Sequence, residues 1–103
     1  MELSVHNRLH LQHFIPKEGN FLTMTIAKDL ISKINFSQEE YKTFGIRPSE
    51  DESQIIWDKE APNSTIEFTE PEIELLKKQV EALDKKNKIT SASFDVAKLI
   101  KEL

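Results

Sequence analysis

The chain has 103 residues with 38% hydrophobic and 31% charged residues, a formal net charge of −4 and no cysteine. This length suits one domain around a single core, and the composition is that of a soluble globular protein. The absence of cysteine excludes disulfides, thiolate metal sites and a cysteine nucleophile, and no apolar run approaches the roughly 20 residues that a membrane span needs.

The first predicted element is a helix from about Val5 to Phe14. Its apolar side chains suit a broad packed face: Leu9, Leu11, Phe14 and Ile15. The alternation of Leu3 and Val5 would also suit a strand, but we favour the helix. Pro16 ends it because the residue before a proline is pushed out of the helical region.

The clearest amphipathic pattern predicts a helix from about Leu22 to Lys33. Apolar side chains recur there at intervals of three and four residues: Ile26, Ala27, Leu30, Ile31 and Ile34. Either Asn20 or Thr23 could accept the first free backbone N–H groups, and the sequence leaves that choice open. We expect Leu30 to be a core position.

A second, short helix is predicted from Ser37 to about Phe44. Ser37 and Glu40 have the spacing of a capping box, Asn35 before them could take a left-handed conformation, and Gly45 supplies the stop. Three aromatic side chains surround the junction of the two helices: Phe36, Tyr41 and Phe44. Two helices joined by a short turn have the outline of a helix-turn-helix.

A β-hairpin is predicted next, with strands at Gln54–Asp58 and Ser64–Phe68 and a loop at Lys59–Asn63. One face of this hairpin would be apolar and would need a helix to cover it. That face carries Ile55, Trp57, Ile66 and Phe68. Trp57 is therefore an expected core position.

A long helix should follow, because Thr69 and Glu72 form a capping box with proline in the first turn. We expect it to end at about Lys86, with Asn87 as its stop. Its apolar stripe consists of Ile73, Leu76, Val80 and Leu83, and its predicted i,i+4 ion pairs are Glu74 with Lys78 and Glu81 with Lys85. Either Thr90 or Ser91 then begins a last helix, which carries Phe94, Val96, Ala97, Leu99, Ile100 and Leu103.

This order of elements predicts a mostly helical α+β fold in one domain, residues 1–103. Residues 1–68 would form a winged-helix-like core of helices and one β-hairpin with a helix-turn-helix, and residues 69–103 a C-terminal helical pair. The topology by itself assigns no function.

Several caps, turns and core positions carry a family resemblance: Arg8-Leu9, Ile15–Phe21, Ile26–Leu30, Phe36–Glu40, Phe44–Ile46, Trp57 and Ile66–Phe68. In these segments the chain resembles a family of small phage- and prophage-encoded proteins of uncharacterised role. The resemblance covers most of the chain. It implies an origin and a fold, and it carries over no active-site residue.

The net negative charge is concentrated in the middle of the chain. Between positions 50 and 70 only Lys59 opposes seven acidic residues: Glu50, Asp51, Glu52, Asp58, Glu60, Glu67 and Glu70. This segment would repel phosphate groups.

His6, His10 and His13 are the candidate metal ligands, because their spacing would place three imidazoles along one helix stripe. The first and last would lie about 10 Å apart along the axis, too far to share one ion readily. We therefore interpret them as a polar helix face and expect no metal and no cofactor.

The sequence offers no catalytic centre. Two glycines, Gly19 and Gly45, cannot form a phosphate-binding or dinucleotide-binding motif, and the carboxylate pairs stand in caps or loops. We therefore expect a non-enzymatic protein. The first ten residues lack the regions of a signal peptide, so we expect it in the cytoplasm.

Two functions remain. The first is a protein-interaction module, which could also form a homodimer through the C-terminal helices. These helices carry more apolar positions than one thin layer over the core requires: Leu75, Leu99 and Leu103. The alternative is a winged-helix DNA-binding protein. Its basic face would be drawn from Arg8, Lys17, Lys28, Lys33, Lys42 and Arg47, although the acidic hairpin opposes this function.

Overall fold

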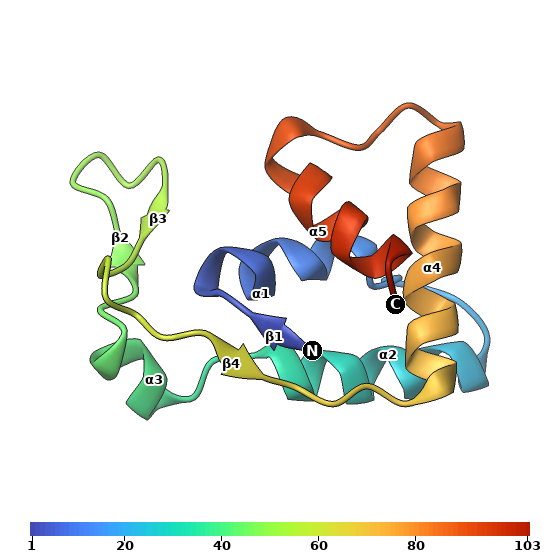
Figure 1. Cartoon of the computed structure of the whole chain (residues 1–103), viewed down its shortest axis with the longest axis horizontal. Helices are drawn as coiled ribbons and strands as arrows, with labels where there is room; N and C mark the ends of the chain where they lie inside the picture. Colours follow the sequence, from blue (N-terminus) through green and yellow to red (C-terminus); the bar gives the residue numbers. More distant parts are fainter.

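Five α-helices and two short antiparallel sheets make up the computed structural model of the chain, which describes residues 1–103 (Figure 1). This confirms the predicted mostly helical α+β class. The elements in chain order are β1 (Glu2–Leu3), α1 (Val5–Leu11), a 3₁₀ turn (Gln12–Phe14), α2 (Phe21–Ile34), α3 (Gln38–Thr43), β2 (Arg47–Pro48), β3 (Ile55–Ile56), β4 (Ser64–Thr65), α4 (Glu70–Lys85) and α5 (Ser91–Lys101).

The core lies between α1, α2, α4 and α5. Figure 1 shows α2 along the lower edge, α4 upright at one side, and α1 and α5 between them. The buried apolar side chains at its centre are Leu3, Leu11, Phe14, Ala27, Leu30, Ile34, Leu76, Val80, Val96 and Ile100. Leu30 is fully buried, as predicted. None of the helices is both long and apolar enough to cross a membrane.

Caps that the sequence predicted are found at four helices. Asn20, not Thr23, caps α2, and the capping boxes of Ser37 and Thr69 are formed at α3 and α4. Thr90, not Ser91, caps α5. Each choice follows from a local hydrogen bond between a side-chain oxygen and a backbone N–H, which needs no tertiary contact.

Two helix stops are also confirmed. Gly45 has φ +65°, and a Cβ atom at this position would lie 2.5 Å from the carboxyl group of Asp58. Asn87 has φ +56°, a left-handed conformation that asparagine tolerates after a helix. The left-handed prediction for Asn35 is wrong, because its φ and ψ of −63° and 148° are extended and lead directly into the next cap.

The predicted hairpin pairing is wrong. β3 pairs with β2, with Ile56 opposite Arg47, and β4 pairs with β1, with Ser64 opposite Leu3. Alternation along a strand defines its two faces but not its partner, which depends on the rest of the fold. A hairpin still follows α3, and in Figure 1 it projects from the helical body.

Several smaller expectations need correction. α1 ends at Leu11 and tightens into the 3₁₀ turn instead of continuing to Phe14. The pairs Glu74 with Lys78 and Glu81 with Lys85 are absent from the three ion pairs of the structure, as expected of exposed side chains that solvent screens. Outside the core lie Ile55, Trp57, Ile31 and Phe94, since the hairpin and the outer faces of α2 and α5 have no element over them.

Candidate functional site

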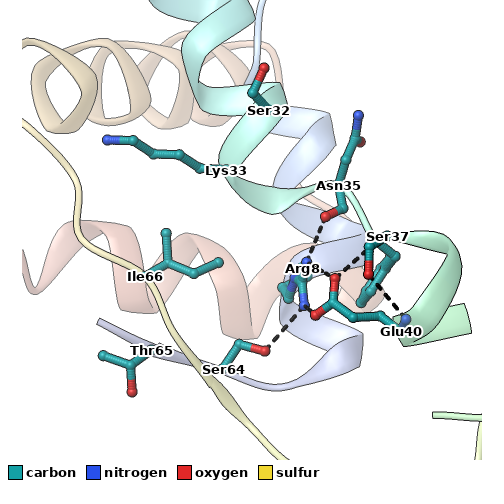
Figure 2. Close-up of a pocket in the computed structure, with 10 residues that line it drawn as sticks. Arg8, Ser32, Lys33, Asn35, Ser37, Glu40, Ser64, Thr65 and Ile66 are labelled. Carbon is teal, nitrogen blue, oxygen red and sulfur yellow. Dashed lines mark hydrogen bonds and ion pairs between the residues drawn. The ribbon is translucent and has the colours of Figure 1, made fainter. Parts of the chain in front are cut away.

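Arg8 lies at the floor of a polar hollow of about 520 Å³ and is only 3% exposed (Figure 2). Its guanidinium group donates five hydrogen bonds. The acceptors are Ile34 O at 3.1 Å, Asn35 O at 2.7 Å, Ser64 Oγ at 3.1 Å, and Glu40 Oε2 and Oε1 at 2.8 and 3.3 Å. One side chain thereby joins α1 to the end of α2, to α3 and to β4.

The surroundings of Arg8 leave it no free donor, because a guanidinium group has five N–H groups and all are used. It also lies over the Phe36 ring at 4.0 Å. The hydrogen bond from Arg8 lowers the pKa of Glu40, although partial burial of that carboxyl opposes the shift. Arg8 therefore has a structural role, since its donors are all used within the chain.

The other basic candidates do not gather into one free surface. Lys33 donates to Glu72 Oε1 at 2.6 Å, and Arg47 donates to Asp58 Oδ1 at 3.3 Å. Lys17, Lys28 and Lys42 remain exposed and form no ion pair. Three of the six residues proposed for a basic face are thus held in intramolecular pairs.

The three histidine rings lie next to one another along α1 and the 3₁₀ turn, with His10 and His13 stacked and His6 tilted against His10. The ring centroids of His6 and His10 are 4.3 Å apart, those of His10 and His13 are 5.6 Å apart, and Trp57 lies 6.3 Å from His6. No group of three or more His, Cys, Asp or Glu side chains is placed to hold a metal ion.

His10 is the most constrained of the three. Its Nδ1 atom is buried and has no hydrogen-bond partner. Burial, and then the neighbouring His6 and His13, lower the pKa of His10, because each disfavours the charged imidazolium. His10 is therefore held in its neutral form over more of the pH range than an exposed histidine.

A second hollow, of about 580 Å³, opens between the hairpin, α1 and the start of α5. It is lined by Leu9, His10, Gln12, His13, Gln54, Ile55, Trp57 and Ala92. Ile55 at its edge is 54% exposed, which is high for an isoleucine. We call this hollow the hairpin groove. Sequence analysis identified the three histidines and Trp57 as separate features. It predicted that the strand with Ile55 and Trp57 pairs with residues 64–68, so it did not predict this hollow.

The loop of the hairpin is strongly acidic. Glu50, Asp51 and Glu52 are all exposed between β2 and β3. Hydrogen bonds from Ser49 and Ser53 lower the pKa of Asp51 to about 2. Asp51 therefore keeps its negative charge beside the hairpin groove in all but strong acid.

The comparisons with known proteins name no relative. No protein-family model, no curated protein and no solved structure matches the chain.

Of the three C-terminal leucines that the sequence singled out, only Leu103 is exposed, at 37%, and Phe94 of α5 is 58% exposed. Leu75 and Leu99 are partly buried and pack against the core of the same chain. Two apolar side chains are instead exposed at the start of α2, Phe21 at 90% and Leu22 at 68%. The signal for this was present in the sequence, because both follow the Asn20 cap directly and precede the apolar face of the helix.

Proposed function

We propose that this chain is a non-catalytic protein-interaction module of the cytoplasm, and that it is a phage-type accessory protein. The observation that carries the proposal is the hairpin groove, where the exposed Ile55 and the half-buried Trp57 stand beside an acidic loop. Exposed apolar side chains in a concave site favour a partner that covers them.

The charge around the groove defines the chemistry of that partner. Four acidic residues, Glu50, Asp51, Glu52 and Asp58, stand in or directly after the hairpin, against Arg47 and Lys59, and Arg47 is already paired with Asp58. An acidic rim attracts lysine and arginine and repels carboxylates. The partner is therefore a protein segment with apolar anchor side chains flanked by basic residues.

DNA binding receives less support from the same features. The hairpin would be the wing of a winged helix, and its acidic loop would face the phosphates. Arg8, Lys33 and Arg47 are held in ion pairs within the chain, so few cations remain to neutralise a phosphate backbone.

Trp57 provides the test, because it is the only tryptophan and lines the groove. The probes are an amphipathic Leu/Lys peptide and a Leu/Glu peptide of the same length and apolar pattern. We expect the Leu/Lys peptide to shift the Trp57 emission to the blue in a saturable way and the Leu/Glu peptide to leave it unchanged. Added salt should weaken the binding, because screening acts on the charged rim.

Two variants make this test specific. Ile55→Ser should weaken binding of the Leu/Lys peptide by roughly tenfold, the size typical of an interface anchor. Phe21→Ser removes an apolar side chain that is even more exposed than Ile55 but lies on α2, outside the groove, and this variant should bind like the wild type. Equal binding of both peptides, or unchanged binding by Ile55→Ser, would contradict the proposal.

A further inference from the structure

Two of the three histidines line the hairpin groove. His10 and His13 stand in its wall, and His6 continues the row, with its ring centroid 6.3 Å from that of Trp57. The other lining side chains do not titrate: Leu9, Gln12, Gln54, Ile55, Trp57 and Ala92. The charge of the groove lining therefore changes only when His10 and His13 gain or lose protons.

The three imidazoles interact with one another. The ring centroids of His6 and His10 are 4.3 Å apart, and those of His10 and His13 are 5.6 Å apart. Since like charges this close repel, a proton on one ring disfavours a proton on the next. Burial lowers the pKa of His10, and His6 and His13 are the only charged groups that contribute further to this shift. The row therefore gains its charge in steps as the pH falls.

No carboxylate pairs with these histidines. None of the three ion pairs of the chain includes a histidine. On its other side His13 borders a hollow with Lys17, which is another cation. The hairpin and α5 contribute only uncharged side chains to the groove lining: Gln54, Ile55, Trp57 and Ala92. A proton taken up by His10 or His13 therefore adds a positive charge that no carboxylate within ion-pair distance neutralises.

Protonation of the groove opposes binding of the basic partner proposed above. Imidazolium groups in the wall repel the lysine and arginine side chains of a segment bound against them. Apolar anchor side chains, which exclude water, also disfavour the charged form of a histidine that they cover. Asp51 in the hairpin loop stays charged in mild acid, because its pKa is about 2. Mild acid therefore changes the histidines and leaves this negative charge in place.

We propose that His10 and His13 make occupation of the hairpin groove depend on pH, so that the basic partner is bound near neutral pH and released in mild acid. This inference rests on the proposed function, because it concerns the regulation of the same groove. By thermodynamic linkage, a partner that prefers the neutral groove also lowers the proton affinity of the histidines. If the partner lowers the pKa of one histidine by one unit, it binds about tenfold more weakly when that histidine is protonated.

Isothermal titration calorimetry with the Leu/Lys peptide tests the pH dependence. We expect the dissociation constant to be about threefold to tenfold larger at pH 5.5 than at pH 7.5. At about pH 6.5, where histidine titrates, binding should release protons, which are counted by repeating the titration in two buffers of different ionisation enthalpy. The proton count needs no acidic solution, so it does not depend on the stability of the protein at pH 5.5.

Two variants assign the effect to the groove lining. The double variant His10→Gln, His13→Gln removes both titratable groups from the lining, so its dissociation constant should change by less than about twofold between the two pH values. The matched control is His6→Gln, because His6 belongs to the row but does not line the groove, and it should keep most of the wild-type dependence. An undiminished dependence in the double variant would overturn the role of these two histidines.

The possible failures of this experiment are distinguishable. A wild type with equal dissociation constants at both pH values and no proton release would overturn the pH dependence and leave the proposed function intact. A Leu/Lys peptide that does not bind at pH 7.5 would contradict the proposed function and the pH dependence together.

Discussion

Arg8 Nη1 donates a hydrogen bond to Glu40 Oε2 at 2.8 Å, across 32 positions of sequence. Glu40 also accepts a hydrogen bond from the backbone N–H of Ser37, which begins α3. The same carboxylate therefore caps a helix and holds the buried guanidinium that joins four elements. This contact joins α3 to α1.

Replacing Arg8 with lysine should destabilise the protein by at least about 2 kcal/mol, because an ammonium group cannot supply the planar fork that reaches four acceptor residues. Equilibrium unfolding in urea measures the loss. Arg47→Lys is the matched control, since its ion pair with Asp58 is exposed, and it should change the free energy of unfolding by less than about 0.5 kcal/mol. Equal losses in the two variants would contradict the structural role of Arg8.

The features of the fold that were predicted correctly from the sequence are those determined by residues close together in the sequence. The caps at Ser37 and Thr69 and the stop at Asn87 each depend on hydrogen bonds or dihedral angles within a few positions. Strand partners and the burial of Arg8 depend on residues tens of positions away. An arginine is normally exposed, so nothing in the local sequence marked Arg8 as part of the interior.

Acid should weaken the protein partly through Glu40. Its pKa in the folded state lies below the ordinary value of 4.5, because Arg8 donates hydrogen bonds to the charged carboxylate. The stabilisation is therefore complete above pH 4.5 and is lost as the pH falls through the folded-state pKa. Glu40→Gln should be less stable than the wild type at neutral pH, and the difference should shrink below about pH 4.

Thermal unfolding at a series of pH values follows this change. Glu39→Gln is the control, because Glu39 is exposed on the same helix and forms no ion pair. It should track the wild type at every pH. A constant difference between Glu40→Gln and the wild type down to pH 3 would show that the ion pair with Arg8 does not carry the acid dependence.

Leu30→Ala should cost about 2–5 kcal/mol, since Leu30 is fully buried in the core between the helices. Trp57→Ala should cost less than about 2 kcal/mol, although tryptophan is larger, because Trp57 is only half-buried beside the groove. Chemical denaturation of both variants gives the comparison. A larger loss for Trp57→Ala would mean that the hairpin contributes more to the fold than its exposure indicates.

Sequence analysis did not predict the hairpin groove, because the groove depends on which strand pairs with β3. Ile55 and Trp57 were recognised as apolar, and apolar residues in a strand pattern predict burial. The structure pairs their strand with β2 and leaves Ile55 at the surface. The same hydrophobicity that suggested a core position thus marks a candidate binding surface once the strand partner is known.

A last prediction concerns His10, whose Nδ1 atom is buried without a partner and whose pKa lies below the ordinary value of 6.5. The unfolded chain accepts a proton at a higher pH than the folded chain. The stability that His10 contributes is therefore present above pH 6.5 and is lost as the pH falls through the folded-state pKa.

His10→Gln, which does not titrate, should lose less stability than the wild type between about pH 7.5 and pH 5. His13→Gln, at an exposed position, should keep most of the wild-type dependence. Melting temperatures across this range decide the matter, because parallel curves for the wild type and His10→Gln would mean that protonation of His10 is not coupled to folding.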